Sequence, residues 1–334
     1  MTTNHRVRRW ATAGAGLTLA LSLAACGGNV GGGSAEGEDF PGDEPITILV
    51  GQDAGGSTDL IARELAEGVS DELGVPVTVE NKPGANGALA AQELAGEDAD
   101  GHTLMVYNGS LAYITPLANE DAPDIADYEI VTGISLDDYV LVTAPDSGFS
   151  TVEDLAAAGR PITFGTTGVG TGSQLSQELL FAQADIDATA VPFDGGSPTL
   201  TAVLGGQVDV GSIQLGEALE QIEAGELDAI VTFAEERPSF LSDVPTAVEA
   251  GYDVPVQQSR AVFAPKDTPD EVLEALRSAF EVAFEDEGYQ AFNEENALTA
   301  NQVDGDEIRE TWTSNLDEYR SVVEEFGIDL GGDQ

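Results

Sequence analysis

Short apolar runs alternate along the chain with segments whose apolar residues recur every three or four positions. After the first run, one face of a predicted helix is formed by Leu60, Ile61, Leu65, Val69 and Leu73. A second helix, made of small residues, is predicted over 88–95. Strands predicted at 46–50, 75–79 and 103–107 complete a βαβαβ run, which is typical of a parallel sheet covered by helices.

The same alternation restarts past Val140. A helix is predicted over 173–184, and strands are predicted at 162–164, 189–192, 208–210 and 229–233. Ser197-Pro198 predicts a further helix start, with serine as the N-cap and proline at the first helical position, and Gly205-Gly206 predicts its end. The chain is therefore predicted to hold two similar α/β units in series.

The C-terminal part is predicted to be helical. Thr268-Pro269-Asp270-Glu271 has the pattern of a capping box with proline at the first helical position. One apolar face of the last helix is formed by Ile308, Trp312, Leu316, Tyr319, Val323 and Phe326. Such a stripe is typical of a helix that packs on a core, so we do not expect it to bind ligand.

Residues 1–25 are predicted to be an export signal. Arginines 6, 8 and 9 precede an apolar run over 10–23, which is shorter than the roughly 20 residues that span a bilayer. The run ends in Leu-Ala-Ala-Cys26, which is similar to a bacterial lipobox, so we expect Cys26 to be a lipid anchor on the outer face of the cell membrane. A cleaved signal with an incidental cysteine is the alternative. Residues 26–44 are expected to be a flexible linker.

Charge narrows the range of partners. Without residues 1–25 the chain keeps 9 of its 12 Lys and Arg and all 61 Asp and Glu, a net charge of −52. Such a field repels nucleic acid, so no nucleic-acid partner is expected. The acids are spread over the whole chain, which favours a halophilic protein in concentrated salt, where the Debye length falls to about 3 Å at about 1 M.

Two glycine-rich turns carry the candidate chemistry. They cover 51–59 and 165–173, each between a predicted strand and a predicted helix. Both place backbone N–H groups and hydroxyls at a helix N-terminus, which carries partial positive charge and suits a carboxylate or phosphate. Either turn alone could be an ordinary βα connection. One turn in each half of the chain indicates an anion-binding cleft between two lobes.

Motifs for catalysis are missing from the sequence. It has no P-loop, no dinucleotide spacing in the second turn and no Gly-x-Ser-x-Gly elbow. His102 is the only histidine after the signal and is predicted to lie in a surface turn, so neither a Ser-His-Asp triad nor a His/Cys zinc site is expected. We expect no enzymatic activity, no cofactor and no metal. An exported hydrolase with a glycine-rich oxyanion hole is the competing class.

These turns and a series of further motifs resemble the extracytoplasmic receptors of tripartite tricarboxylate transporters, the Bug/TctC family. The resemblance runs from Pro45 to the final helix. Its landmarks follow the family's order and include Gly55-Gly56-Ser57-Thr58-Asp59, Val79-Glu80-Asn81-Lys82-Pro83-Gly84-Ala85, Val191-Pro192-Phe193, Gly205-Gly206-Gln207-Val208-Asp209 and Val244-Pro245-Thr246. Each motif is weak alone, but the ordered set is specific.

The resemblance implies an α/β, two-lobe periplasmic-binding-protein fold, type II-like, with the ligand cleft between the lobes. The first lobe would comprise 45–142 plus 261–334, and the second 143–260. The implied role is that of a monomeric lipoprotein that captures a small organic anion, a di- or tricarboxylate or a related acid, for large and small integral membrane transporter subunits. A sensor receptor that feeds a two-component signalling system is the alternative.

The resemblance also implies ligand contacts at the two turns, partly through water. The residues expected to bind ligand are Gln52, Gly55, Gly56, Ser57, Thr58, Asp59, Asn108, Ser110, Thr167, Gly168, Gly170, Thr171, Phe193 and Arg260. The segment 80–84 is expected to form a structural turn beside the cleft.

Four residues, in three places, depart from the family's pattern. Gly51-Gln52 stands where a Pro-aromatic pair is usual, Gln174 where histidine is usual, and Asp194 where a basic residue is common. These changes predict a more polar and less positive pocket. Arg260 is predicted where the chain crosses back between the lobes, and two roles remain open for it: pairing with a ligand carboxylate, or an inter-lobe salt bridge.

Overall fold

The computed structural model describes residues 40–331, so the predicted signal, Cys26 and the linker up to residue 39 lie outside the described residues. Phe40 packs edge-on against the His102 ring, with 5.3 Å between the ring centroids. Contacts with the first lobe thus begin at Phe40, although residues up to 44 are predicted to be a flexible linker. Phe40 makes these contacts because its ring packs against the apolar core of that lobe. Within these residues no helix combines the length and the apolar character that a membrane span requires.

The first lobe is built on three parallel strands in the order β2-β1-β3. These strands are β1 (Ile46–Val50), β2 (Val77–Asn81) and β3 (Thr103–Asn108). The helices that follow them are α1 (Ser57–Leu73), α2 (Ala88–Leu94), α3 (Gly109–Tyr113) and α4 (Thr115–Ala118). Fully buried Ile61, Leu65 and Val69 hold α1 on the sheet, as its helical pattern predicts, whereas Leu60 is exposed.

The second lobe repeats this design. Its strands are β5 (Ile162–Thr166), β6 (Ala188–Pro192), β7 (Val210–Gln214) and β8 (Asp228–Thr232). Its helices are α5 (Val152–Ala156), α6 (Gly172–Gln183), α7 (Gly196–Leu204) and α8 (Leu215–Glu223). Strand β5 pairs in parallel with both β6 and β7, so these three strands end at the same edge.

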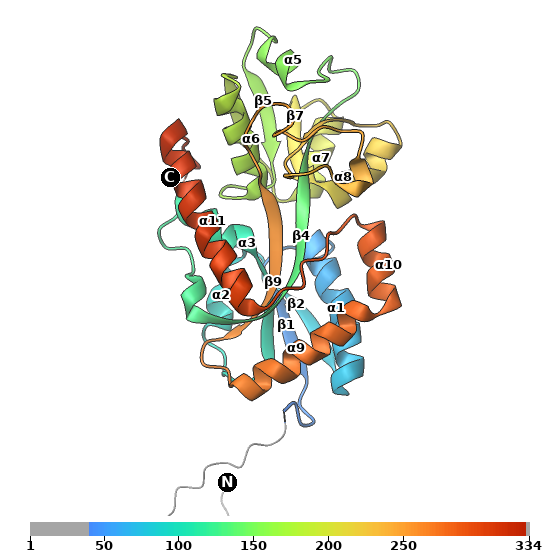
Figure 1. Cartoon of the computed structure of the whole chain (residues 1–334), viewed down its shortest axis with the longest axis vertical. Coiled ribbons are helices and arrows are strands. Elements are labelled where there is room, and N and C mark those ends of the chain that lie inside the picture. Colours follow the sequence, from blue (N-terminus) through green and yellow to red (C-terminus); the bar gives the residue numbers. More distant parts are fainter. Residues whose placement is uncertain (1–39, 332–334) are drawn as a thin grey trace, which may run out of the picture. The chain divides into compact units, whose positions relative to one another are not determined.

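Two long strands pass between the lobes. They are β4 (Tyr128–Thr143) and β9 (Gln257–Pro265), which run side by side and antiparallel through the centre of Figure 1. The β9 pairing of β4 ends at Asp138, and Tyr139 begins its pairing with β7. The chain therefore crosses twice between the strand groups, near the predicted crossings, although the predicted lobe boundaries themselves stay a prediction.

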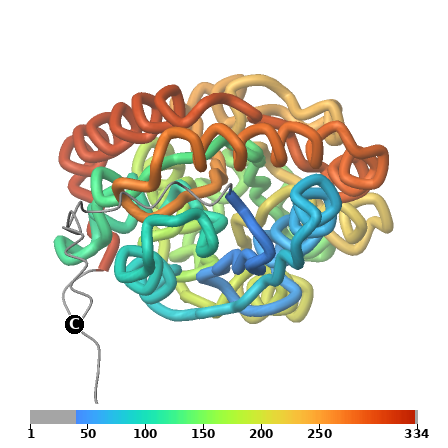
Figure 2. The backbone as a smooth tube through the Cα atoms, turned by 90° about the horizontal axis from the view of Figure 1, so that it is seen from below, coloured from blue at the N-terminus to red at the C-terminus, as the bar shows by residue number. Residues whose placement is uncertain are grey.

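Three helices complete the fold after β9. They are α9 (Asp270–Glu285), α10 (Glu287–Glu295) and α11 (Gly305–Phe326), drawn in orange to red along one side of the molecule in Figure 2. Trp312 of α11 stacks on Phe263 of β9, with centroids 5.5 Å apart, and donates its indole N–H to Ser259 Oγ at 3.0 Å. The aromatic stripe of α11 is thus core, as predicted, except that Phe326 at its end is exposed.

Two predicted helix starts are wrong. Helix α7 begins at Gly196 with Gly195 as its N-cap, so Ser197 lies inside the first turn and does not cap it. Helix α9 has Pro269 as its N-cap, and the Thr268 hydroxyl donates to the Pro265 carbonyl at 2.7 Å instead of capping the helix. In both cases the helix begins one or two residues away from the start predicted from the polar residue, and the residue at the N-cap is glycine or proline.

Candidate functional site

The candidate site lies where loops from the two lobes meet. In the second lobe the loops after β5, β6 and β7 leave the same edge of the sheet, and in the first lobe the turn 51–56 leads from β1 into α1. Ligands of open α/β sheets bind beyond such carboxyl edges. The N-cap of α1 is Gly56, which offers no side-chain cap, so the first N–H groups of α1 are left for another acceptor.

Asp59 holds the first turn in shape. Its buried carboxylate accepts from the Gly55 amide at 2.8 Å, from Asn81 Nδ2 at 2.9 Å and from Arg63 Nε at 3.0 Å. Burial alone would raise the pKa of Asp59, but these hydrogen bonds outweigh burial and lower it. The carboxylate therefore faces its own loop, and Asn81 ties the 80–84 turn to that loop.

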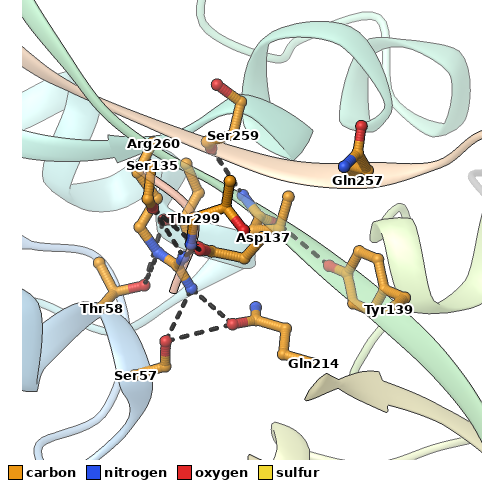
Figure 3. Close-up of polar contacts among 12 residues, drawn as sticks. Ser57, Thr58, Ser135, Asp137, Tyr139, Gln214, Gln257, Ser259, Arg260 and Thr299 are labelled. Atoms are coloured by element: carbon orange, nitrogen blue, oxygen red, sulfur yellow. Dashed lines mark hydrogen bonds and ion pairs between the residues drawn. The ribbon is translucent and has the colours of Figure 1, made fainter. Parts of the chain in front are cut away.

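Arg260 is the centre of the site and is 0% exposed. Its Nη2 atom donates to Gln214 Oε1 at 2.6 Å and to Ser57 Oγ at 2.9 Å. Its Nη1 atom forms an ion pair with Asp137 of β4. Figure 3 shows these side chains around the guanidinium group. Arg260 therefore joins residues of both lobes and a crossing strand.

Hydroxyl and amide groups extend this network into the first lobe. Thr58 Oγ1 accepts from Arg260 Nε at 3.1 Å and donates to Asn108 Oδ1 at 3.1 Å. Asn108 ends β3, and Ser110 lies in the first turn of α3; both are buried. The Ser57 hydroxyl also donates a hydrogen bond to Gln214 Oε1, at 3.2 Å. Ser57 and Gln214 thus link the start of α1 directly to the start of α8.

The second glycine-rich loop uses many of its own donors. Thr171 is the N-cap of α6 and donates to the Gly168 carbonyl at 2.8 Å. The Gly170 amide donates to Gln174 Oε1 at 2.9 Å, and the Thr167 amide donates to Ser173 Oγ at 3.1 Å. This loop is therefore pre-organised by its own side chains, with fewer open amides than expected from the sequence.

Gly170 brings this loop against the first lobe. Its φ of +69° is in the left-handed region, and a Cβ there would lie 3.4 Å from Thr115 Cα. The Gly170 carbonyl accepts from Thr115 Oγ1 at 3.1 Å and from Asn86 Nδ2 at 3.3 Å. A glycine permits both the turn and this close approach between the lobes.

Two further predicted residues line the same region. The Phe193 amide donates to the Thr166 carbonyl at 3.0 Å, which places Phe193 beside the second loop. Gln52 lies in the first turn, where its backbone carbonyl accepts from Asn81. Among the described residues its buried Oε1 atom has no hydrogen-bond partner.

Comparison with known proteins decides the family. Residues 61–328 match the model of the tripartite tricarboxylate transporter family receptor. This chain belongs to that receptor family. A UPF0065 protein from the TAR-I ttuE-ttuC' intergenic region of Agrobacterium vitis is similar to this receptor, with 35% identity over 75% of each chain. Protein BugT of Bordetella pertussis is 29% identical over 86% of this receptor and 90% of its own length.

Solved structures agree with this family assignment. A periplasmic transporter superposes on this receptor with a TM-score of 0.80 and 29% identity, covering 87% of this chain and 99% of its own. MatC of Rhodopseudomonas palustris with bound malate gives a TM-score of 0.77 at 27% identity, covering 84% and 98%. Rpa4515 of R. palustris with adipate gives 0.80 at 25%, covering 87% and 99%. The family resemblance and the periplasmic-binding-protein fold are thus confirmed.

The structure of this receptor joins four of the predicted residues, and the others stay predictions. Ser57, Thr58, Asn108 and Arg260 form one hydrogen-bonded network, whereas Asp59 faces away into its loop. Arg260 has an ion-pair partner, Asp137, so the salt-bridge role is present in this structure. The ligand role of Arg260 stays a prediction, and its Nη2 atom donates to Gln214 at the inter-lobe contact.

Sequence reasoning missed Gln214, Asp137, Asn86 and Thr115. Gln214 ends β7 and directly precedes α8. The two glycine-rich turns also lie between a strand and a helix, so this position in the pattern could have marked Gln214 as a site residue. Asp137 lies in a strand of nearly unbroken burial, and its sequence neighbours do not show that Arg260 faces it. Asn86 and Thr115 meet the second lobe only through tertiary contacts with the Gly170 carbonyl.

Proposed function

We propose that this protein is the extracytoplasmic solute-binding lipoprotein of a tripartite tricarboxylate-type transporter. It captures a small organic anion, a di- or tricarboxylate or a related acid, as a monomer and delivers it to the large and small integral membrane subunits. It performs no reaction on the ligand. Cys26 holds it on the outer face of the cell membrane.

One oxygen position carries this proposal. Gln214 Oε1 accepts from Arg260 Nη2 at 2.6 Å and from Ser57 Oγ at 3.2 Å. A guanidinium N–H and a serine hydroxyl that converge on one oxygen are the donors that a carboxylate oxygen requires. The uncapped start of α1 adds backbone N–H groups and partial positive charge beside this position. A ligand carboxylate replaces the Gln214 oxygen there.

The other predicted residues divide into two roles in this proposal. Ser57, Thr58, Asn108 and Ser110 present polar groups to the ligand from the first lobe, and the loop 167–171 closes on it from the second. Asp59 is a positioning residue, because its carboxylate fixes the Gly55 amide and the turn that holds Gly56. Gln52 and Phe193 flank the site from opposite lobes.

Lobe closure transmits the binding event. The contacts of Gly170 with Thr115 and of Gln214 with Ser57 exist only when the lobes approach each other. A ligand that binds both lobes favours this closed arrangement through its higher affinity for it. The transporter subunits recognise the closed form.

Calorimetric titration of the mature chain with di- and tricarboxylates, aromatic acids and acidic amino acids tests the proposal. Ser57→Ala is expected to weaken the best acid at least about tenfold, because a hydrogen bond to a charged group is lost. Ser314→Ala, at an exposed position of α11, is the matched control and leaves affinity unchanged. Failure of every acid to bind would contradict the proposal.

Anchoring is tested separately in cells. Cys26→Ala is expected to move the protein from the membrane fraction to the soluble fraction, because a lipid chain can no longer be attached. Retention of the variant on the membrane would contradict the lipid anchor. Ligand uptake that requires the two membrane subunits supports transport, whereas a signalling response without uptake indicates the sensor role.

A further inference from the structure

Glu217 brings a second carboxylate to the edge where the second-lobe loops meet. It is the third residue of α8, three positions after Gln214, and it is half-buried. Its carboxylate lies directly over Gly196, the first residue of α7, so that any side chain at Gly196 would overlap it. The N-cap of α7, Gly195, supplies no side-chain cap. Glu217 therefore lies at the starts of two helices, three positions after Gln214, at the edge where the loops of the second lobe meet.

No cationic group is paired with Glu217 among residues 40–331: the ion pairs in that range do not include it. Arg260 is near enough for its charge to act on Glu217, but all three guanidinium nitrogens of Arg260 already donate, and Asp137 balances its charge. Burial raises the pKa of Glu217, and the charge of Arg260 lowers it only in part.

We propose that Glu217 is a specificity-determining residue that selects a ligand with a protonated amine, or a similar cationic group, at the end remote from its carboxylate. This inference rests on the proposed function, since it presumes that a carboxylate binds between Arg260, Ser57 and the start of α1. The ligand's ammonium group forms an ion pair with the Glu217 carboxylate and so neutralises its negative charge. A second carboxylate at that end would instead meet a like charge in a partly desolvated site.

Glu217 would give this receptor a different ligand preference from two of its structural neighbours. MatC and Rpa4515 were solved with malate and adipate, which are both dicarboxylates. At the proposed ligand position Arg260 is already paired with Asp137, and Glu217 has no cationic partner among residues 40–331. Asp194, exposed on the loop before α7, adds a further negative charge near the same edge. The charge balance therefore disfavours a ligand with two carboxylates and favours a zwitterion.

A matched ligand series tests this directly. Calorimetric titration at about pH 8 compares succinate with 4-aminobutyrate, glutarate with 5-aminopentanoate, and adipate with 6-aminohexanoate, at the lowest salt at which the mature chain stays folded, because salt screens the effect. Each pair exchanges one terminal carboxylate for an aminomethyl group, so the ammonium nitrogen takes the place of a carboxylate oxygen and the number of carbons is unchanged. Glu217→Gln removes the selecting charge, and Glu220→Gln, exposed on the same helix, is the matched control.

The expected result is at least a tenfold preference for the amino acid in the pair of fitting length, with that preference reduced at least tenfold in Glu217→Gln and unchanged in Glu220→Gln. Equal or tighter binding of the dicarboxylate in every pair would overturn the role of Glu217 while leaving carboxylate capture intact. So would an unchanged preference in Glu217→Gln. Binding of no acid in the series or in the wider panel would overturn the proposed function itself. If Glu217→Gln does not fold, the wild-type preference decides.

Discussion

Arg260 Nη2 donates to Gln214 Oε1 at 2.6 Å, and this hydrogen bond joins a crossing strand to the end of a second-lobe strand. Ser57 donates to the same oxygen from the first lobe. The Gln214 amide thus occupies a position that suits a ligand oxygen. In the proposed function this amide stabilises the approach of the lobes and competes with the ligand for the same donors.

Removal of this competing oxygen is expected to tighten ligand binding. In Gln214→Ala the donors Arg260 Nη2 and Ser57 Oγ are free before the ligand binds. The affinity for the best acid should therefore rise about threefold to tenfold, because the ligand no longer has to break a hydrogen bond to Gln214. Calorimetric titration measures the change. Gln92→Ala, exposed on α2, serves as the control. A loss of affinity in Gln214→Ala would show that the side chain contacts the ligand instead of competing with it.

The buried pair of Arg260 and Asp137 is expected to dominate the effect of mutations on stability. Arg260→Met should cost about 3–5 kcal/mol of unfolding free energy, because Asp137 would remain as an unpaired buried charge. The double variant Arg260→Met with Asp137→Asn should recover at least about half of this loss. Denaturant unfolding measures both.

The control for this pair is Arg320→Met, which breaks an exposed pair with Asp317 and should cost under about 0.5 kcal/mol. If Arg260→Met cost no more than this control, or if the double variant recovered nothing, the pair would have no special role in stability.

Much of the fold was predictable because its signals are local. The βα alternation follows from the period of the apolar residues, so β1, β3, α2 and α6 appear within two residues of their predicted positions. The long crossing strand β4 was not predicted from the pattern, because it is buried on both faces and offers no alternation to detect. The wrong caps at Ser197 and Thr268 show the same limit: backbone conformation at Gly195 and Pro269 decided those starts.

The candidate site was predictable only where a motif marks it. Glycine and hydroxyl residues in the turn 51–59 indicate a helix start that is open to an anion, which the uncapped α1 shows. The partners of Arg260 were not predictable, because Asp137 and Gln214 are 123 and 46 residues away in the chain and meet it only after both lobes have formed. The inward turn of Asp59 likewise depends on Asn81, which lies at the end of β2, 22 residues further along the chain.

Asp138 is expected to make stability depend on pH. Burial raises the pKa of Asp138 to about 6, and the charge of Asp137 adds to the shift, whereas the hydrogen bond from Gln257 opposes it. Because the folded-state pKa exceeds the unfolded value, the protonated form favours folding, and this contribution is lost as pH rises through about 6. Its size is about 3 kcal/mol for a shift of about two pKa units.

Asp138→Asn tests this dependence. The unfolding free energy of the variant minus that of the wild type should increase by about 2 to 2.5 kcal/mol between about pH 4 and pH 7 and stay level above that range. Asp146→Asn, at an exposed position, should show a difference that does not change with pH. A level difference for Asp138→Asn as well would mean that Asp138 titrates alike in the folded and unfolded chains.

Salt is expected to stabilise the folded protein. Without the predicted signal the chain carries a net charge of −52, and self-repulsion of this size is screened as the Debye length shortens. The melting temperature should rise by at least about 10 °C from about 0.1 M to a few molar sodium chloride. Sorbitol at equal osmolality separates charge screening from general crowding. A melting temperature that does not change with salt would contradict the halophilic interpretation.

A crystal structure of the mature chain with its tightest-binding acid tests most directly where the ligand binds. We expect a ligand carboxylate oxygen within hydrogen-bond distance of Arg260 Nη2 and Ser57 Oγ, beside the first amides of α1, with the Gln214 side chain displaced. The loop 167–171 should enclose the ligand from the second lobe. A ligand lodged away from both loops, with the bond between Arg260 and Gln214 intact, would contradict this site.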